Sequence, residues 1–334
     1  MTVYNTIRGL RVKYLSADPA GAEDGQVWYN STTGNLRVDG ILAPGSFSSG
    51  GNLSTGRYAI GSAGTFTAGL AIGGDLFGSN PSSRGSNSTE EYNGTSWTGG
   101  GNLGTSGSWR AGAGTQTAAS GTAGNNYSSY MSTSENYDGS SWTSSTSAPY
   151  AAEGSVSTGS RAASIWGGGG APSQSPEYPP KFFYGDGEGW TAITNSNNAN
   201  RYASVFTGTQ TAALLTGGQS PQTANTESWN GSSWTNLSAF PTPFANAAGN
   251  RVGTSTAAVA AGGASPGGTL TSSSHWNGSS WSADASLAQA HNSSASAGTQ
   301  EAYYVAGGPG AAPLRNATEE YTGGSVITKN LSTS

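Results

Sequence analysis

Residues that could do covalent chemistry are scarce in this chain. Its 334 residues contain no cysteine, two histidines, His275 and His291, and 18 aspartates and glutamates. The lack of cysteine excludes a thiolate nucleophile, a thiolate metal ligand and a disulfide. The sequence also has no Ser-His-Asp set, HExxH motif or phosphate-binding loop. We therefore expect a protein that is not an enzyme, with no catalytic residue, no metal site and no cofactor.

Polar side chains at a recurring position could bind a ligand without reacting with it. Arg57, Arg201 and His291 each lie seven residues before a Gly-Thr step, and Asn246 has the same spacing to Gly253-Thr254. If this position faces a central channel, the four side chains form a polar ring that could bind a carboxylate or sugar hydroxyls. Capping and hydrogen bonding within the fold are the alternative role, and we prefer that interpretation.

Four aromatic residues are further binding candidates because they stand outside a regular pattern. Trp109, Trp166, Phe182 and Phe183 break a spacing that the other large aromatic residues keep. We expect these four side chains to make exposed contacts with a partner.

That regular pattern is a repeat, Glu-x-Tyr/Trp-Asn/Asp-Gly-x-Ser-Trp, which must position all of these side chains. Its copies end 44 to 48 residues apart. This period is the length of one four-stranded propeller blade. The closing residues of the six copies are Trp97, Trp142, Trp190, Trp234, Trp281 and Val326.

Each copy reads as four short strands joined by turns. In the fourth copy, strands are expected over 201–206 and 211–216, through Trp229 and from Ser233. The Asn-Gly and Asp-Gly steps favour two-residue hairpins. That register would pair Tyr92 with Thr95 and place Tyr92 and Trp97 on one face, where they pack neighbouring blades together. The same structural role is expected for Tyr137, Trp142, Trp190, Trp229, Trp234, Trp276, Trp281 and Tyr321.

The order of Arg or His, two strands, Gly-Gly, a loop, the Glu-x-Tyr-Asn/Asp-Gly step and Trp resembles the kelch repeat over roughly residues 46–334. Trp229 and Trp276 replace the usual Tyr, and the third repeat is irregular. The resemblance implies an all-β, six-bladed kelch-like β-propeller with four-stranded antiparallel blades. The segment from Phe47 to Leu53 aligns with Trp97–Leu103, so we expect it to complete or shield the last blade, which ends in Val326.

The first 45 residues do not belong to the repeat. Residues 25–38 read as two strands around a Ser-Thr-Thr-Gly turn, and so short a segment cannot bury much core alone. The string Gly-Gln-Val-Trp-Tyr-Asn-Ser-Thr-Thr-Gly is similar to a short module of bacteriophage tail-fibre and other virion proteins. The resemblance implies an anchoring or oligomerisation segment over residues 1–45, with Trp28, Tyr29 and Asn30 in the anchor, followed by the propeller over 46–334.

Charge and hydropathy narrow the function classes. A net charge of −5 offers no basic stripe for nucleic acid, and no stretch approaches the 18 apolar residues of a membrane span. We also expect no signal peptide. The connections between the Gly-Gly pairs and the aromatic strands differ in length, 17 residues in the first repeat and 10 in the fourth. Such variation on one face fits either a recognition surface or drift on an idle one.

Together these features predict a structural protein of a marine-type bacteriophage virion, on a tail fibre, elsewhere on the tail or on the capsid surface. It would be made in the host cytoplasm and form a homo-oligomer in the particle. Residues 1–45 would bind other virion proteins, and the propeller loops would recognise a host-surface glycan or protein. A free, lectin-like carbohydrate-binding propeller is the alternative, and a glycan-cleaving enzyme is a third, less favoured interpretation.

Overall fold

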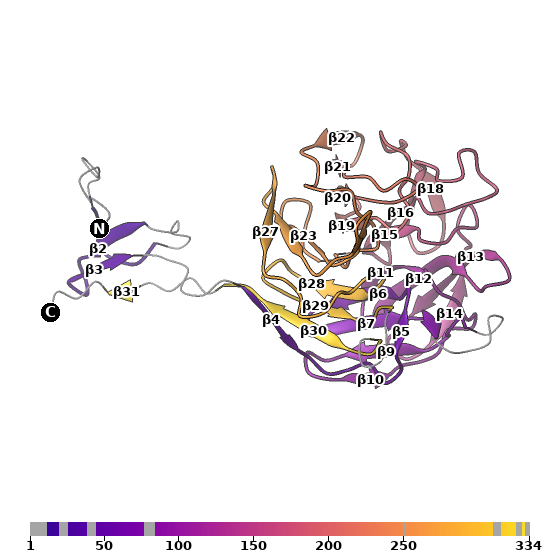
Figure 1. Ribbon diagram of the computed structural model, residues 1–334, viewed down its shortest axis with the longest axis horizontal. Coiled ribbons are helices and arrows are strands. Elements are labelled where there is room, and N and C mark those ends of the chain that lie inside the picture. The colour runs from indigo at the N-terminus through magenta and orange to yellow at the C-terminus, as the bar shows by residue number, and fades with distance from the viewer. Residues whose placement is uncertain are drawn as a thin grey trace. The chain divides into compact units, whose positions relative to one another are not determined.

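The computed structural model describes residues 12–19, 26–38, 45–76, 84–249, 252–309, 315–324 and 329–330 (Figure 1). Every regular element within these ranges is a β-strand, as the all-β prediction requires. No helix in the described part of the chain could cross a membrane. Two compact units are present: unit 1 comprises Met1–Gly45 with Gly323–Ser334, and unit 2 comprises Ser46–Thr322.

Unit 1 contains a four-stranded sheet in the order β1-β2-β3-β31. β1 and β2 pair in parallel, whereas β3 is antiparallel to both of its neighbours. We expected residues 323–334 to belong to the propeller, but β31 pairs with β3 and therefore joins both ends of the chain in unit 1. The strands are β1 (Lys13–Leu15), β2 (Val27–Asn30), β3 (Asn35–Val38) and β31 (Lys329–Asn330).

Within the described residues, unit 2 contains six consecutive antiparallel sheets, one for each sequence repeat, which we call blades 1 to 6. Blade 5 has three strands and the others have four. Blades 1 to 3 comprise β6 (Gly61–Thr65), β7 (Ala68–Ile72), β9 (Thr89–Tyr92) and β10 (Trp97–Gly99); β11 (Ala111–Thr115), β12 (Ala118–Asn125), β13 (Tyr130–Tyr137) and β14 (Trp142–Ser145); and β15 (Val156–Ser160), β16 (Ala163–Gly167), β17 (Phe182–Gly185) and β18 (Trp190–Ala192).

The remaining strands of unit 2 follow the same plan. Two short ribbons, β5 with β8 and β24 with β25, lie outside the blades. Blades 4 to 6 comprise β19 (Val205–Thr209), β20 (Ala212–Thr216), β21 (Thr226–Trp229) and β22 (Trp234–Leu237); β23 (Ala258–Ala261), β26 (Ser273–Trp276) and β27 (Trp281–Asp284); and β28 (Ala295–Gly298), β29 (Ala302–Ala306), β30 (Thr318–Thr322) and β4 (Ser46–Ser49). The ribbons are β5 (Arg57–Tyr58), β8 (Asp75–Leu76), β24 (Ala264–Ser265) and β25 (Gly268–Thr269).

The first strands of the repeats lie at the centre of unit 2 (Figure 1). β28 contacts β6, which contacts β11, and the series continues through β15 to β19. Between β19 and β28, the segment before β23 closes the circle, because Val252 forms a bridge with Gly298 and Asn246 bonds to Ala203. These strands are rich in glycine, alanine and serine because they approach closely. A Cβ atom on Gly112, for example, would lie 2.0 Å from the carbonyl oxygen of Ser62.

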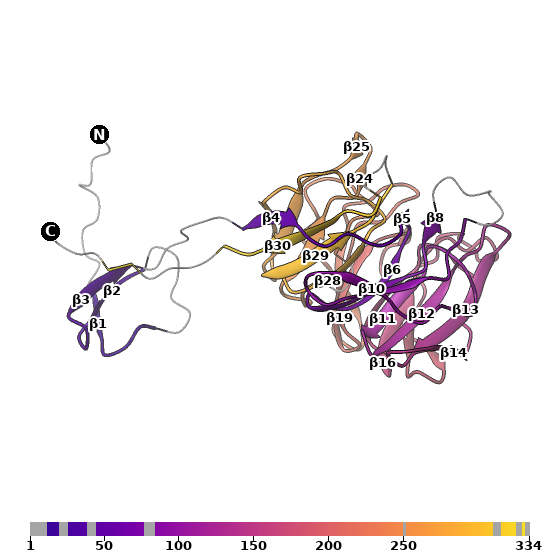
Figure 2. The same cartoon turned by 90° about the horizontal axis from the view of Figure 1, so that it is seen from below.

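The ring of blades is completed by β4, which pairs with β30 as the outer strand of blade 6 (Figure 2). Phe47 lies opposite Tyr321, as Trp97 lies opposite Tyr92 in blade 1. The prediction that the segment around Phe47 completes the last blade is confirmed. Phe47, and not Val326, therefore takes the place of the closing tryptophan, and Val326 falls outside the described residues.

The aromatic hairpins differ from prediction in their turns. Tyr92 pairs directly with Trp97, so the loop has four residues and the predicted pairing of Tyr92 with Thr95 is wrong. The cause is the Asn93 side chain, whose Oδ1 accepts hydrogen bonds from the backbone N–H groups of Thr95 and Ser96, each 2.9 Å long. This Asx turn satisfies the backbone without a type I′ turn.

The paired aromatic residues do pack neighbouring blades together, as expected. The Tyr92 and Trp97 rings are 4.8 Å apart. Trp97 Nε1 donates to Thr318 Oγ1 of blade 6 across 3.0 Å. Trp142 and Trp281 bond in the same way to threonines of the preceding blades. Each tryptophan therefore fastens its own blade to the previous one.

Candidate functional site

The side chain of Arg57 is buried against blade 1, where protein groups accept hydrogen bonds from both of its terminal nitrogens. Its side chain has 0% exposure and its Nη2 lies 2.7 Å from Glu90 Oε1. Its Nη1 donates to the carbonyl oxygens of Gly73 and Ser88 at 2.8 and 2.7 Å. Burial lowers the pKa of Arg57, and the charge of Glu90 opposes that shift. Arg57 thus clamps two strands of one blade.

Three other blades contain an equivalent buried pair of a cation-forming side chain and a glutamate. Each also has a bond to a backbone carbonyl: Arg201 to Gly217, Arg110 to Thr105, and His291 to Gly307. The predicted ligand-binding ring of Arg57, Arg201 and His291 is therefore not formed, because every member is enclosed within its own blade. The pairs are Arg110–Glu135, Arg201–Glu227 and His291–Glu319.

Glu319 shows how completely such a glutamate is satisfied. Burial acts to raise its pKa, but hydrogen bonds from His291 and from the backbone N–H groups of Ala288 and Gln289 outweigh burial and lower that pKa. The carboxylate therefore already accepts three hydrogen bonds from protein groups, two at Oε1 and one at Oε2.

Asn246 belongs to a different position from Arg57. The carbonyl of Arg57 accepts a hydrogen bond from the second glycine of a Gly-Gly pair in the preceding blade, and in blade 5 the residue that does so is Phe244. The connection from Phe244 to Gly253 is two residues longer than the one from Arg57 to Gly64. Counting seven residues back from Gly253 therefore identified Asn246, whereas the residue equivalent to Arg57 is the buried Phe244.

Asn246 instead belongs to a ring of six residues with left-handed backbone, one from each repeat, of which the other five lie two residues before the first strand of their blade. Their φ angles lie between 50° and 60°. For a residue other than glycine this conformation costs about 1–2 kcal/mol. The members of this channel ring are Ala59, Trp109, Gly154, Ala203, Asn246 and Ser293.

Backbone hydrogen bonds tie the channel ring together from blade to blade. Trp109 N–H donates to the Ala59 carbonyl at 2.8 Å, and Asn246 N–H donates to that of Ala203 at 2.9 Å. Three further bonds join Gly154 to Ala203, Asn246 to Ser293, and Ser293 to Ile60. Four of the six members, Trp109, Ala203, Asn246 and Ser293, thus donate their own N–H to a carbonyl of the neighbouring blade.

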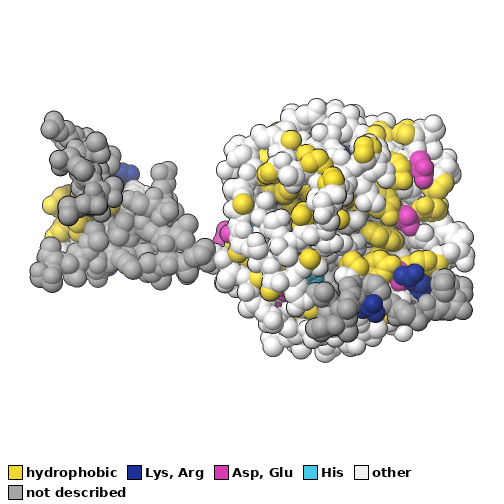
Figure 3. Space-filling model, in the orientation of Figure 1, with side chains coloured by type: hydrophobic (Ala, Val, Ile, Leu, Met, Phe, Trp, Pro, Cys, Tyr) yellow, Lys and Arg dark blue, Asp and Glu magenta, His cyan; other side chains and the backbone are white. Residues whose placement is uncertain are grey.

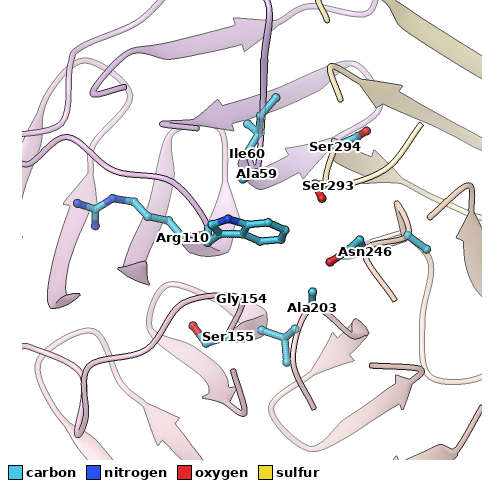
Figure 4. Close-up of a pocket in the computed structure, with 12 residues that line it drawn as sticks. Ala59, Ile60, Arg110, Gly154, Ser155, Ala203, Asn246, Ser293 and Ser294 are labelled. Atoms are coloured by element: carbon cyan, nitrogen blue, oxygen red, sulfur yellow. The ribbon is translucent and has the colours of Figure 1, made fainter. Parts of the chain in front are cut away.

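A cavity opens at the channel ring and is lined by residues of all six blades (Figure 4). The space free of protein atoms there, counted together with the solvent at its open mouth, is about 410 Å³, and all six members of the channel ring line it. Arg110 contributes to the lining, but its guanidinium points away from the cavity and pairs with Glu135 at 3.5 Å. The lining is therefore uncharged, with small apolar and polar groups beside the indole of Trp109.

An aromatic and polar cluster adjoins this cavity. The half-buried Trp109 ring lies 5.7 Å from that of Tyr202, which in turn lies 6.1 Å from Tyr178. Tyr202 donates to Glu153 at 3.2 Å, and Asn125 Nδ2 donates to the other oxygen of Glu153 at 2.7 Å. Burial, reinforced by Glu153, raises the pKa of Tyr202 and keeps its hydroxyl protonated.

The structure does not place the other three aromatic candidates at an exposed surface. Trp166 has 0% exposure and donates to Ser155 Oγ at 3.0 Å, and Phe182 packs on Trp234 with ring centroids 4.9 Å apart. Phe183 is half-buried, and its ring lies 6.1 Å from that of Trp166. Since Gly185 pairs with Trp190, Phe183 takes the strand position that Glu90 has in blade 1. The irregular third repeat thus replaces an ion pair with apolar packing.

In unit 1, two of the three predicted anchor residues are internal. Trp28 and Asn30 are 1% and 4% exposed, and both donate to Asp18 Oδ1, at 3.0 and 2.9 Å. Tyr29 is half-buried on the opposite face, with its ring 4.7 Å from that of Tyr14. Trp28 and Asn30 therefore build the sheet, and only Tyr29 lies on a face that could contact a partner.

The face of unit 1 that carries Tyr29 is apolar. Within the described residues, all the large hydrophobic side chains that are exposed belong to this unit. β1 and β2 pair Tyr14 with Tyr29, and the alternation of a strand puts Val12 and Val27 on the same side. The exposed members of this apolar face are Val12, Tyr14 and Val27.

Few charged side chains lie on the face of unit 2 that Figure 3 shows. Among the described residues, no group of three histidine, aspartate or glutamate side chains is arranged to hold a metal ion. The channel mouth offers stacking on Trp109 and neutral hydrogen bonds.

Comparison with known proteins identifies the fold. One matching solved structure, titled "Structure of YjhT", aligns with a TM-score of 0.65 over 84% of this chain and 99% of that chain, at 13% sequence identity. The fold of unit 2 is a β-propeller. No protein-family model and no curated protein matches the sequence. Because 228 chains of solved structures match, and this one at such low identity, the likeness shows the fold alone.

Proposed function

We propose that this protein is a non-enzymatic structural protein of a bacteriophage virion with a kelch-like propeller. Unit 1 attaches it to other virion proteins, including sister subunits, and the propeller presents its channel mouth and the neighbouring loops to a host-surface glycan or protein. The sequence resemblance of residues 25–38 to a virion module and the division of the chain into two units support this proposal.

The observation that carries the proposal is the apolar face of unit 1. A sheet that leaves Tyr14 76% exposed and Val12 40% exposed loses the free energy that burial of these side chains would give. Exposed apolar patches on otherwise polar proteins mark interaction sites. The described parts of both ends belong to unit 1, so the chain passes between the attachment unit and the propeller at residues 45–46 and 322–323.

Replacement of Tyr14 and Val27 by serine tests the attachment. The propeller contacts of unit 2 are untouched, so the variant is expected to stay folded by circular dichroism and yet to be depleted from purified particles at least about tenfold. Thr98→Ala, an exposed change in blade 1, is the matched control and is expected to enter particles normally. Normal incorporation of the double variant would refute the attachment role.

A free, lectin-like propeller is the second candidate, and the aromatic cavity at the channel mouth favours it. Glycan binding by a protein that is absent from purified virions would support this alternative. Release of cleaved products from host polysaccharide would instead show an enzyme and would contradict both proposals.

A further inference from the structure

Trp109 is the exception in the channel ring. The other five positions hold glycine, alanine, serine or asparagine, which are small or tolerate a left-handed backbone. A bulky aromatic residue at a φ of 58° is an outlier, and such strained residues cluster at ligand sites. Local preference alone would select a small residue at this position, so the indole is held at the channel mouth against that preference.

The groups around the indole are polar but uncharged. Asn246 Oδ1 has no hydrogen-bond partner, and its Nδ2 has only a long contact of 3.4 Å with Gln219. Asn246, Ser293 and Ser294 lie on one side of the cavity (Figure 4). Ser294 donates to Gly307, so its oxygen can still accept a hydrogen bond. This combination offers donors and acceptors beside a flat apolar ring.

The charges nearby argue against an anionic ligand. The guanidinium of Arg110 points away from the cavity, and Arg57 and Arg201 are enclosed in their blades. The carboxylate nearest in the cluster is Glu153, which bonds to Tyr202 beside Trp109. Among the described residues that line the cavity, only Arg110 is charged, and its guanidinium points away, so a carboxylate or sulfate there would find no cation to pair with.

We propose that the channel mouth binds a neutral sugar residue, with its apolar ring face on Trp109 and its hydroxyls on Asn246 and Ser293. Beyond the buried Tyr202, the half-buried ring of Tyr178 gives a second sugar of the same chain a place to lie. This inference rests on the recognition role proposed above and specifies the ligand as a neutral glycan.

The test screens the full-length protein on an array of neutral, sialylated and sulfated oligosaccharides and then measures the best neutral one by calorimetry. Trp109→Asn copies the residue of blade 5, which already has this backbone conformation, so the variant is expected to fold. It is expected to lose at least about tenfold in affinity, Asn246→Ala about threefold or more, and Trp109→Phe less than Trp109→Asn.

The Tyr14 and Val27 double variant is the control, because it leaves the channel mouth unchanged and is expected to bind the glycan normally. Unchanged affinity of Trp109→Asn, preference for sialylated or sulfated glycans, or no glycan binding would overturn the inference. Each of these results would leave attachment to virions unaffected. Conversely, neutral-glycan binding that depends on Trp109 in a protein absent from virions would keep this inference and refute the proposed function.

Discussion

The buried ion pairs show how a single residue position can have a structural role where the sequence suggests a binding one. Arg201 and Glu227 are both 0% exposed; Arg201 also donates to the carbonyl of Gly217, and Glu227 accepts from the backbone N–H of Asn197 in the connection before blade 4. Transferring the two charges out of water costs nearly as much free energy as their attraction returns, so such a pair adds little net stability. Blade 3 has Phe183 in place of the glutamate and still forms a regular sheet. Both residues of a pair can therefore be replaced together by apolar ones, but replacing one alone leaves the other as a buried, unpaired charge.

Glu227→Gln is expected to lower the free energy of unfolding by about 3–5 kcal/mol, because Arg201 is left buried without a counter-charge. Arg201→Met is expected to cost a similar amount. The double variant Arg201→Met, Glu227→Leu should lose less than the sum of the two, as urea denaturation of all four proteins would measure. Strictly additive losses would show that the two side chains do not act as a pair.

At the scale of elements, the sequence predicted the strands better than their turns and ends. The period and the aromatic pairs assigned four strands to each repeat, which is correct except in the fifth, where three are described, and the strand expected over 201–206 begins only at Val205. The alignment of Phe47 with Trp97 identified the strand that closes blade 6. The four-residue turn after Tyr92 was missed because the Asn93 side chain replaces a backbone bond. The pairing of β31 with β3 was missed because a two-residue strand has no periodicity to detect.

Phe47→Ala is expected to destabilise the protein by about 1–3 kcal/mol, because the half-buried ring packs on Tyr303 and Tyr321 at the closure of the ring. Phe47→Trp restores the residue of the other five repeats and is expected to preserve or raise stability. Ser48→Ala on the same strand, where the side chain is exposed, should change stability by less than about 0.5 kcal/mol. Equal melting temperatures for Phe47→Ala and Ser48→Ala would mean that β4 does not hold the ring closed.

At the scale of the whole molecule, the propeller could be predicted from its repeat but its candidate site could not. A channel ring defined by backbone φ angles leaves no residue signature, since its six positions hold five different residue types. Trp109 was identified as an aromatic residue outside the pattern, but Trp166 and Phe182 gave the same signal and are buried. What separates them is the cavity, which forms only when all six blades are assembled. Comparison of the repeats by their Gly-Gly contacts, and not by fixed counts, would have aligned Trp109 with Asn246.

The same assembly determines how the molecule responds to alkali. Burial, with neighbouring carboxylates in several cases, raises the pKa of Tyr58 and Tyr137 to about 12, and it also raises that of Tyr92, Tyr150, Tyr202, Tyr303 and Tyr321. Above about pH 10 the unfolded chain loses tyrosine protons that the folded chain keeps, so stability present below pH 10 is lost as pH rises towards 12. Lysine occurs only at positions 13, 181 and 329, so tyrosines dominate this titration. Urea denaturation at about pH 8, 10 and 11 should show a steepening loss of stability that Tyr137→Phe reduces. A flat profile over this range would mean that these tyrosines already ionise in the folded protein.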